Sequence, residues 1–223
     1  MLLENRVGIV TGGGMGMGEA VARRWASEGA LVVLTDINSE AGQTVADSIQ
    51  ADGGEVRFVL ADSGSEEDWE NVISLTLQEF GGLDIMHNNA AVHFWFDTLN
   101  DPIEKWDELM RINLRGVFLG CRFAIPKMIE RGGGAIVNTS SVSALHGVPL
   151  QALYGASKAG VSLLTRSLAR AYGPNGIRVN AINPGTIDTP MLHQAAAEAA
   201  EMRSDDEGPP GERMPTFYGA YIR

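Results

Sequence analysis

The sequence predicts an α/β protein, a single domain in which a doubly wound parallel sheet carries helices on both faces. Short β-branched runs alternate with longer segments of helical period, which is typical of βαβ units. Glycines follow the expected helices, where C-terminal caps need them. No internal repeat or low-complexity linker divides the 223 residues, so we expect one domain over residues 1–223.

The expected strands and helices alternate in order. Strands are expected near residues 6–11, 30–35, 55–60, 83–87, 134–139 and 177–182. The helices expected between them span residues 16–28, 39–52, 66–80, 103–131 and 152–173. Each pair of successive strands is therefore joined by a helix, as parallel strands require.

The C-terminal part of the chain differs from this pattern. An alanine-rich stretch at 194–202 predicts a helix, and a charged segment with two prolines at 203–213 predicts a mobile loop. The apolar residues 216–222 fit either a short edge strand or an unpaired end.

Composition and charge argue against several kinds of partner. A formal net charge of −11 disfavours nucleic acid and anionic membranes, which bind clustered Lys and Arg. The single cysteine, Cys121, lies in an expected helix and predicts a small buried hydrophobe. No basic leader or long apolar run precedes the first strand, so we expect a soluble, cytoplasmic protein. Neither His87 nor His193 has a partner at ligand spacing, and we expect no metal.

A glycine-rich turn joins the first expected strand to the first helix. Its spacing is G-x-x-x-G-x-G, from Gly12, Gly16 and Gly18, and not the strict G-x-G-x-x-G. Such glycines let the backbone approach a pyrophosphate, while the helix N-terminus supplies free N–H groups. A flexible connection would show the same pattern. Asp36 ends the second strand at the separation typical of the acidic residue that binds the adenosine ribose, and its charge would repel a 2′-phosphate. Together the turn and Asp36 favour NAD over NADP.

Tyr154 and Lys158 lie one helical turn apart, on one face of the helix expected at 152–173. A phenol has an ordinary pKa of about 10, so proton transfer near pH 7 requires a shift of about three units, or about 4 kcal/mol. One ammonium at ~4 Å supplies on the order of 4 kcal/mol at an effective dielectric near 20. The pair therefore predicts a proton-transfer site in which the lysine supplies most of the shift.

Two serines, Ser140 and Ser141, follow the strand expected at 134–139. Ligands of open α/β sheets bind beyond the carboxyl ends of the strands, so these hydroxyls face the expected crevice. Ser141 is predicted to hydrogen-bond the substrate oxygen, although a serine at a strand end is otherwise a turn former.

With these residues, the sequence resembles the classical short-chain dehydrogenase/reductase family, whose sheet is of the Rossmann type, over residues 5–192. The matching elements are Thr11-Gly12-x-x-x-Gly16-x-Gly18, Asp62-Ser63, Asn88-Asn89-Ala90-Ala91, Asn113, Ser141, Tyr154-x-x-x-Lys158 and Pro184-Gly185. The resemblance implies hydride transfer between NAD(H) and a secondary alcohol or ketone. It also implies that Tyr154 is the acid and base, and that Lys158 lowers the pKa of Tyr154 and holds the nicotinamide ribose. In the same resemblance, Ser141 orients the substrate and Asn113 anchors a water that links Lys158 to solvent.

The resemblance also implies contacts with the cofactor. Asp62 would meet the adenine, Asn89 the adenosine side, and Ile187 the nicotinamide carboxamide through its backbone; Ser140 is left as structural. The expected cofactor residues are Gly12, Met15, Gly16, Met17, Gly18, Asp36, Asp62, Ser63, Asn89, Tyr154, Lys158 and Ile187.

Two features depart from the family pattern. Ala91 replaces the last glycine of Asn-Asn-Ala-Gly. No clear equivalent of the family's final helix and seventh strand follows Met202. We therefore expect residues 193–223 to form an atypical tail beside the core. Either residues 216–222 supply a substitute strand, or the sheet keeps an exposed edge.

The expected substrate pocket is aromatic and apolar with two imidazoles, which suits an uncharged cyclic or aryl secondary alcohol or ketone. Its candidate residues, chosen by their position in the chain, are His93, Phe94, Trp95, Leu145, His146, Val148, Gln151, Met191 and Leu192. An ordinary loop position is the alternative for both histidines.

The two long helices carry more apolar positions than one sheet face needs, which predicts, with the resemblance, a homodimer or homotetramer. The positions concerned are Val117, Phe118, Val161, Leu164 and Leu168. An alternative function is that of a non-catalytic NAD-binding sensor of the same fold, which predicts the loss of a catalytic residue; none is missing. A hydrolase based on Ser141 lacks the Gly-x-Ser-x-Gly elbow.

Overall fold

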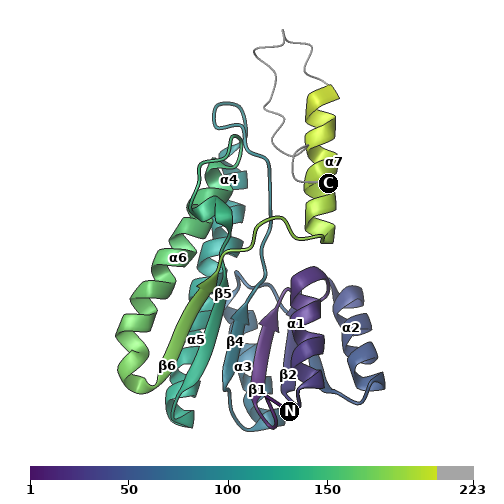
Figure 1. Ribbon diagram of the computed structural model, residues 1–223, viewed down its shortest axis with the longest axis vertical. Coiled ribbons are helices and arrows are strands. Elements are labelled where there is room, and N and C mark those ends of the chain that lie inside the picture. The colour runs from purple at the N-terminus through teal and green to yellow at the C-terminus, as the bar shows by residue number, and fades with distance from the viewer. Residues whose placement is uncertain (205–223) are drawn as a thin grey trace.

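The computed structural model describes residues 1–204 and has a six-stranded parallel sheet with helices on both faces (Figure 1). The strands are β1 (Val7–Thr11), β2 (Leu31–Asp36), β3 (Glu55–Leu60), β4 (Ile85–Asn88), β5 (Gly134–Thr139) and β6 (Ile177–Ile182). Their order is β3-β2-β1-β4-β5-β6, so the direction in which the sheet grows reverses between β1 and β4. The predicted doubly wound fold is confirmed.

Seven α-helices occur in the described part of the chain. They are α1 (Gly16–Ser27), α2 (Ser39–Ala51), α3 (Glu66–Phe80), α4 (Ile103–Met110), α5 (Val117–Arg131), α6 (Ala152–Tyr172) and α7 (Pro190–Ser204). Ordinary capping chemistry is seen at α2 and α3. The Asn38 side chain accepts a hydrogen bond from the Ala41 N–H at the start of α2, and Gly81 ends α3 in the left-handed conformation with φ 75°.

Alternate residues of the central strands face two separate apolar cores. Ile9 and Val33 point to the side covered by α3, α5 and α6, where they join a large buried cluster. Val10 and Val32 point to the other side and pack with α1 and α2. Burial on both faces explains the continuous β-branched runs of these strands.

The helix predicted as one element at 103–131 is interrupted. A π-helical turn, Arg111–Gly116, lies between α4 and α5 and contains the buried Asn113. The backbone of this turn packs closely against the loop after β3, since a Cβ at Gly116 would lie 3.1 Å from the Ser63 carbonyl oxygen. Apolar periodicity does not distinguish such a turn from a regular helix.

Helix α7 is longer than expected. It begins at Pro190 and not near residue 194, and proline suits the first helical position because that N–H has no partner within the helix. It continues through Ser204, so Arg203 and Ser204 belong to the helix and not to a loop. The Trp95 indole N–H donates to the Ala195 carbonyl oxygen at 2.9 Å and ties α7 to the loop after β4. Residues 205–223, with the expected loop and the apolar segment at 216–222, lie outside the described residues.

Most of the apolar positions that suggested a subunit interface are used inside this chain. Val117 and Val161 are buried in the core, and Leu164 and Leu168 pack against it. Of the five, Phe118 is exposed, at 42%. Their number on α5 and α6 is therefore explained by the core. No helix in residues 1–204 is long and apolar enough to cross a membrane.

Gly18 lies in the first turn of α1, directly under the glycine-rich loop. A Cβ there would overlap the Gly12 carbonyl oxygen, and the Asn89 amide lies 2.7 Å from the same point. The absence of a side chain at Gly18 thus lets the helix approach the loop closely.

Gly18→Ala should lower the free energy of unfolding by on the order of 1–3 kcal/mol, because backbone atoms must move to admit the methyl group. Urea unfolding followed by circular dichroism measures the change. Gly173→Ala is the matched control, because Gly173 has open space around its Cβ position and helical φ and ψ. Equal stability of the two variants would contradict this explanation of Gly18.

Candidate active site

Two adjoining cavities lie at the carboxyl ends of the strands, where the sheet order reverses. The larger has a volume of about 370 Å³ and the smaller about 150 Å³. The residues that border both are Met17, Thr139, Tyr154, Thr189 and Met191. The cavities therefore meet at Tyr154, in the position where open α/β sheets bind ligands.

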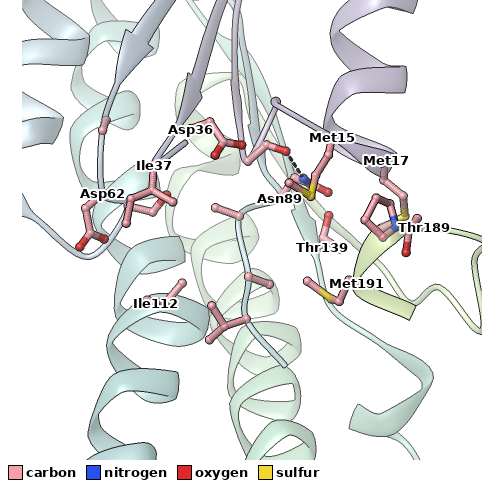
Figure 2. A pocket seen from close by; sticks show the side chains of 18 of the residues that line it. Met15, Met17, Asp36, Ile37, Asp62, Asn89, Ile112, Thr139, Thr189 and Met191 are labelled. Carbon is pink, nitrogen blue, oxygen red and sulfur yellow. Dashed lines mark hydrogen bonds between the residues drawn. The ribbon is translucent and has the colours of Figure 1, made fainter. Parts of the chain in front are cut away.

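The glycine-rich loop forms one wall of the larger cavity. Gly12 and Gly16 have φ values of 62° and 58°, which side chains rarely adopt. The Asp36 carboxylate is 8% exposed and accepts hydrogen bonds from the N–H groups of Gly14 at 2.8 Å and Asn38 at 2.9 Å. Asp36 and Ile37 lie toward one end of this cavity, and Thr139 and Met191 toward the other (Figure 2). One carboxylate thus shapes the loop and borders the cavity.

The loop after β4 is held against the glycine-rich loop. The Thr11 hydroxyl oxygen accepts hydrogen bonds from the N–H groups of Asn89 and Ala90, both at 3.0 Å. The Asn89 side-chain amide donates to the carbonyl oxygens of Thr11 at 3.1 Å and Gly12 at 3.2 Å. Its Oδ1 is buried and has no hydrogen-bond partner among the described residues. A buried acceptor without a donor costs about 1–3 kcal/mol, so the cavity is suited to a ligand that brings one.

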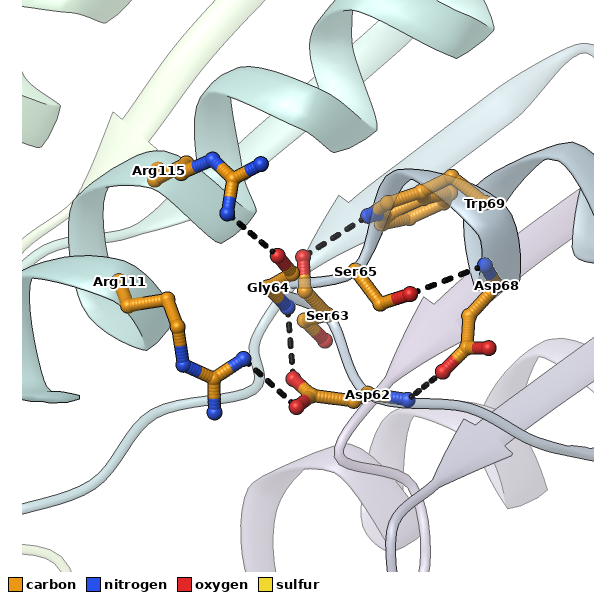
Figure 3. Close-up of polar contacts among 8 residues, drawn as sticks. All are labelled: Asp62, Ser63, Gly64, Ser65, Asp68, Trp69, Arg111 and Arg115. Atoms are coloured by element: carbon orange, nitrogen blue, oxygen red, sulfur yellow. Dashed lines mark hydrogen bonds and ion pairs between the residues drawn. The ribbon is translucent and has the colours of Figure 1, made fainter.

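Two arginines of the π-helical turn hold the loop after β3 (Figure 3). Arg111 Nη1 lies 2.6 Å from Asp62 Oδ2, and the other oxygen of Asp62 accepts from the Gly64 N–H at 2.7 Å. Arg115 donates to the Gly64 carbonyl oxygen at 2.9 Å. The sequence reasoning missed both arginines; their spacing at i and i+4 was the signal that could have found them.

Lys158 is buried behind Tyr154. Its side chain lies on the same face of α6 as Tyr154, and Nζ is 5.6 Å from the centroid of the tyrosine ring. Nζ donates to the Thr139 carbonyl oxygen at 3.0 Å, at the end of β5. Burial lowers the pKa of Lys158 from its ordinary 10.5 to about 8. The structure thus brings together the pair that the helical spacing predicted.

The two serines after β5 have separate surroundings. Ser141 borders the smaller cavity together with Tyr154, and its Oγ accepts from the Ser143 N–H at 3.1 Å, so its own proton is kept for donation. Ser140 Oγ instead donates to the Lys158 carbonyl oxygen at 2.8 Å. Ser140 therefore fastens the strand end to α6, as expected of a structural residue.

The side chain of Asn113 holds the loop after β4. Its Oδ1 accepts from the Val92 N–H and its Nδ2 donates to the Val92 carbonyl oxygen, both at 2.8 Å. This pair of bonds fixes Val92, the residue before His93, against the π-helical turn. Asn113 is 0% exposed and borders neither cavity, and through its bonds it positions Val92, which borders the larger one.

Ten of the twelve residues expected at the cofactor border the larger cavity. Those ten are Gly12, Met15, Gly16, Met17, Asp36, Asp62, Ser63, Asn89, Tyr154 and Lys158. Gly18 does not, because it packs beneath the loop, and Ile187 borders the smaller cavity. The close packing of Gly18 beneath the loop is what the structure shows, and a contact of Gly18 with the cofactor stays a prediction.

The expected substrate residues divide into two groups. His93, Gln151, Met191 and Leu192 border the smaller cavity. Neither cavity is bordered by the other five, Trp95, Phe94, Leu145, His146 and Val148, whose role at the substrate stays a prediction. Trp95 lies behind His93, and Phe94 packs against a small apolar core. Leu145 and His146 are exposed, in the loop that follows the 3₁₀ helix Val142–Ala144. Among the described residues, no cluster of three His, Cys, Asp or Glu could hold a metal ion.

Comparisons with known proteins agree on one family. A family model described as short chain dehydrogenase matches residues 6–200. A 2,5-dichloro-2,5-cyclohexadiene-1,4-diol dehydrogenase of Sphingobium indicum is 43% identical over 86% of this chain and 77% of its own. A cyclohexanol dehydrogenase of an Acinetobacter species is 38% identical over 89% and 79%. The crystal structure of levodione reductase has a TM-score of 0.85 and 38% identity, and the match covers 91% of this chain and 79% of that one.

Lys158→Met should raise stability at pH 7 by about 1–3 kcal/mol, because it removes a buried ammonium at the cost of one hydrogen bond. The folded pKa of about 8 lies below the ordinary 10.5, so the unfolded chain binds more protons between these pH values. The parent therefore gains stability as pH rises through this window, and the advantage of the variant should shrink from pH 8 upward.

Urea unfolding of both proteins at pH 7 and pH 9.5 measures this difference. Lys127 on α5 forms an ion pair with Glu130 at the surface. Lys127→Met therefore controls for the loss of a positive charge. An advantage of Lys158→Met that does not shrink with pH would show that burial of this ammonium is not its source.

Proposed function

Because the chain belongs to the short-chain dehydrogenase family, we propose that it is an NAD(H)-dependent oxidoreductase that interconverts a compact cyclic secondary alcohol and its ketone. The observation that carries this proposal is the meeting of two cavities at Tyr154, with Lys158 buried behind it and Ser141 on the wall of the smaller one. The relatives support the substrate class, since they are named for a cyclic diol, for cyclohexanol and for levodione.

The larger cavity fits a nicotinamide dinucleotide. The left-handed glycines Gly12 and Gly16 leave room for a pyrophosphate at the start of α1, and Asn89 Oδ1 offers a buried acceptor to a hydroxyl or amine donor. Asp36 would accept hydrogen bonds from the ribose hydroxyls and repel a 2′-phosphate, which favours NAD. When bound, such a cofactor accepts a hydride from the alcohol or returns one to the ketone.

Tyr154 moves the proton in this mechanism. In the oxidation direction its phenolate takes the hydroxyl proton of the alcohol, while the carbinol hydrogen leaves as a hydride. Ser141 donates a hydrogen bond to the same oxygen and keeps the carbinol carbon facing the larger cavity. In the reduction direction Tyr154 returns the proton to the oxygen of the ketone.

Lys158 supports the charge on the phenolate. Its ammonium is held near the Tyr154 ring by the Thr139 carbonyl oxygen, and the low dielectric of the buried site strengthens its effect. Asn113 keeps the loop after β4 in place through Val92. The water that the family resemblance assigns to Asn113 stays a prediction.

The assembly and location of the protein are also part of the proposal. Phe118 on α5 is 42% exposed and Leu163 on α6 is 63% exposed, and these faces suit a contact with a second copy. The homodimer or homotetramer, the small-molecule substrate as the main partner, and the cytoplasmic location stay predictions.

Tyr154→Phe should lower kcat/KM for cyclohexanol oxidation by about 10²- to 10⁴-fold, the usual contribution of a general acid and base. The formation of NADH, followed by its absorbance, measures the rate, and NAD binding should persist. Tyr172→Phe near the far end of α6 is the matched control. Undiminished activity of Tyr154→Phe would contradict the mechanism, whereas a parent that binds NAD and oxidises no cyclic alcohol would favour a non-catalytic NAD-binding protein.

Asp36→Asn should weaken the preference for NAD over NADP by about 10- to 100-fold, because one negative charge near the 2′-phosphate is removed while the side chain can still accept the Gly14 bond. The ratio of kcat/KM for the two cofactors is the measurement. Asp47→Asn on the exposed face of α2 controls for net charge. A parent without a preference for NAD would contradict the role assigned to Asp36.

A further inference from the structure

His93 borders the smaller cavity, and the proposed proton and hydride transfers do not use it. Its ring is held edge-on between two other aromatic rings. The centroid distance is 5.0 Å to Tyr154 and 5.2 Å to Trp95, and the Trp95 indole is itself bonded to α7. The imidazole is therefore fixed beside the catalytic tyrosine and at the wall of the cavity where the substrate reacts.

The two ring nitrogens of His93 have no hydrogen-bond partner in the part of the chain that the structure describes. Both nitrogens are buried. Burial lowers the pKa of His93, and the negative charge of Glu198 on α7 opposes this with a smaller effect. The lowered pKa keeps the ring neutral near pH 7. A neutral imidazole carries one donor and one acceptor, and both are costly to leave unpaired in a buried site.

The ring can present a nitrogen to the cavity without a change of shape. A half-turn about the Cβ–Cγ bond exchanges each nitrogen with a carbon atom, and the contacts with Tyr154 and Trp95 remain those of a flat ring of the same size. An oxygen of a bound molecule would then satisfy a nitrogen that residues 1–204 leave without a partner.

We infer that His93 is a specificity-determining residue that binds a second oxygen of the substrate. The reacting oxygen is already assigned to Tyr154 and Ser141, so the oxygen that His93 meets is a different one on the same ring. The substrate class is therefore a small cyclic diol, hydroxyketone or dione. This inference rests on the proposed function, whose cyclic alcohol it makes more specific.

The neutral ring suits both oxidation states of such a substrate. It accepts a hydrogen bond from a hydroxyl group and donates one to a carbonyl group, according to its tautomer. A carboxylate in the same place would be buried without a compensating positive charge from His93, so the inference also favours uncharged rings. At about 150 Å³, the smaller cavity favours a single small ring over a fused ring system.

The test compares kcat/KM for cyclohexanol with the values for cyclohexane-1,2-diol and cyclohexane-1,4-diol. The parent should prefer at least one diol by about 10-fold or more, since a site built to bind a hydroxyl group discriminates against the analogue that lacks it. His93→Phe keeps the aromatic contacts and should lose this ratio, and His93→Asn should regain part of it. His193→Phe changes an exposed histidine on α7 and should keep the ratio of the parent.

The outcomes separate the inference from the proposed function. A parent that oxidises cyclohexanol and both diols equally well overturns the inference alone, as does His93→Phe if it lowers all three values by the same factor. A parent that oxidises none of the three alcohols with either cofactor overturns the proposed function and the inference with it.

Discussion

The burial of the Lys158 ammonium is the constraint on which the rest of the site depends. A charged group without solvent needs a fixed acceptor, and here the Thr139 carbonyl oxygen supplies it. Ser140 binds the backbone of Lys158, and His87 holds the side chain of Thr139 at 3.0 Å, so the end of β5 and the first turns of α6 keep one register. That register places Tyr154, one turn earlier, where the two cavities meet.

Several polar side chains around the cavities serve the framework and the site together. Asp36 fixes the glycine-rich loop through Gly14 and borders the larger cavity. Asn89 fastens the loop after β4, and its buried Oδ1 has no hydrogen-bond partner among the described residues. Asn113 binds Val92 and so sets the position of His93. A site of this kind is preorganised, because the groups that would meet ligands are already held by the fold.

The strands and the pairing of Tyr154 with Lys158 were predictable from the sequence, because both follow from periodicity. The strands have buried apolar runs, and Tyr154 and Lys158 share a face at i and i+4. Irregular backbone was not predictable: the π-helical turn that carries Arg111 and Asn113 has the apolar pattern of an ordinary helix. Loop direction was equally hidden: the loop after β5 leaves His146 exposed and outside both cavities, and Gly18 packs beneath the glycine-rich loop.

Lys158 is buried beside Tyr154, the proposed acid and base, and its titration reports that burial most directly. The sequence contains three lysines, Lys105, Lys127 and Lys158, so selective ¹⁵N labelling of their Nζ atoms gives a simple NMR spectrum. One Nζ resonance should titrate near pH 8 and should be absent in Lys158→Met. A spectrum in which no Nζ resonance shifts between pH 7 and pH 9 would contradict the burial of Lys158.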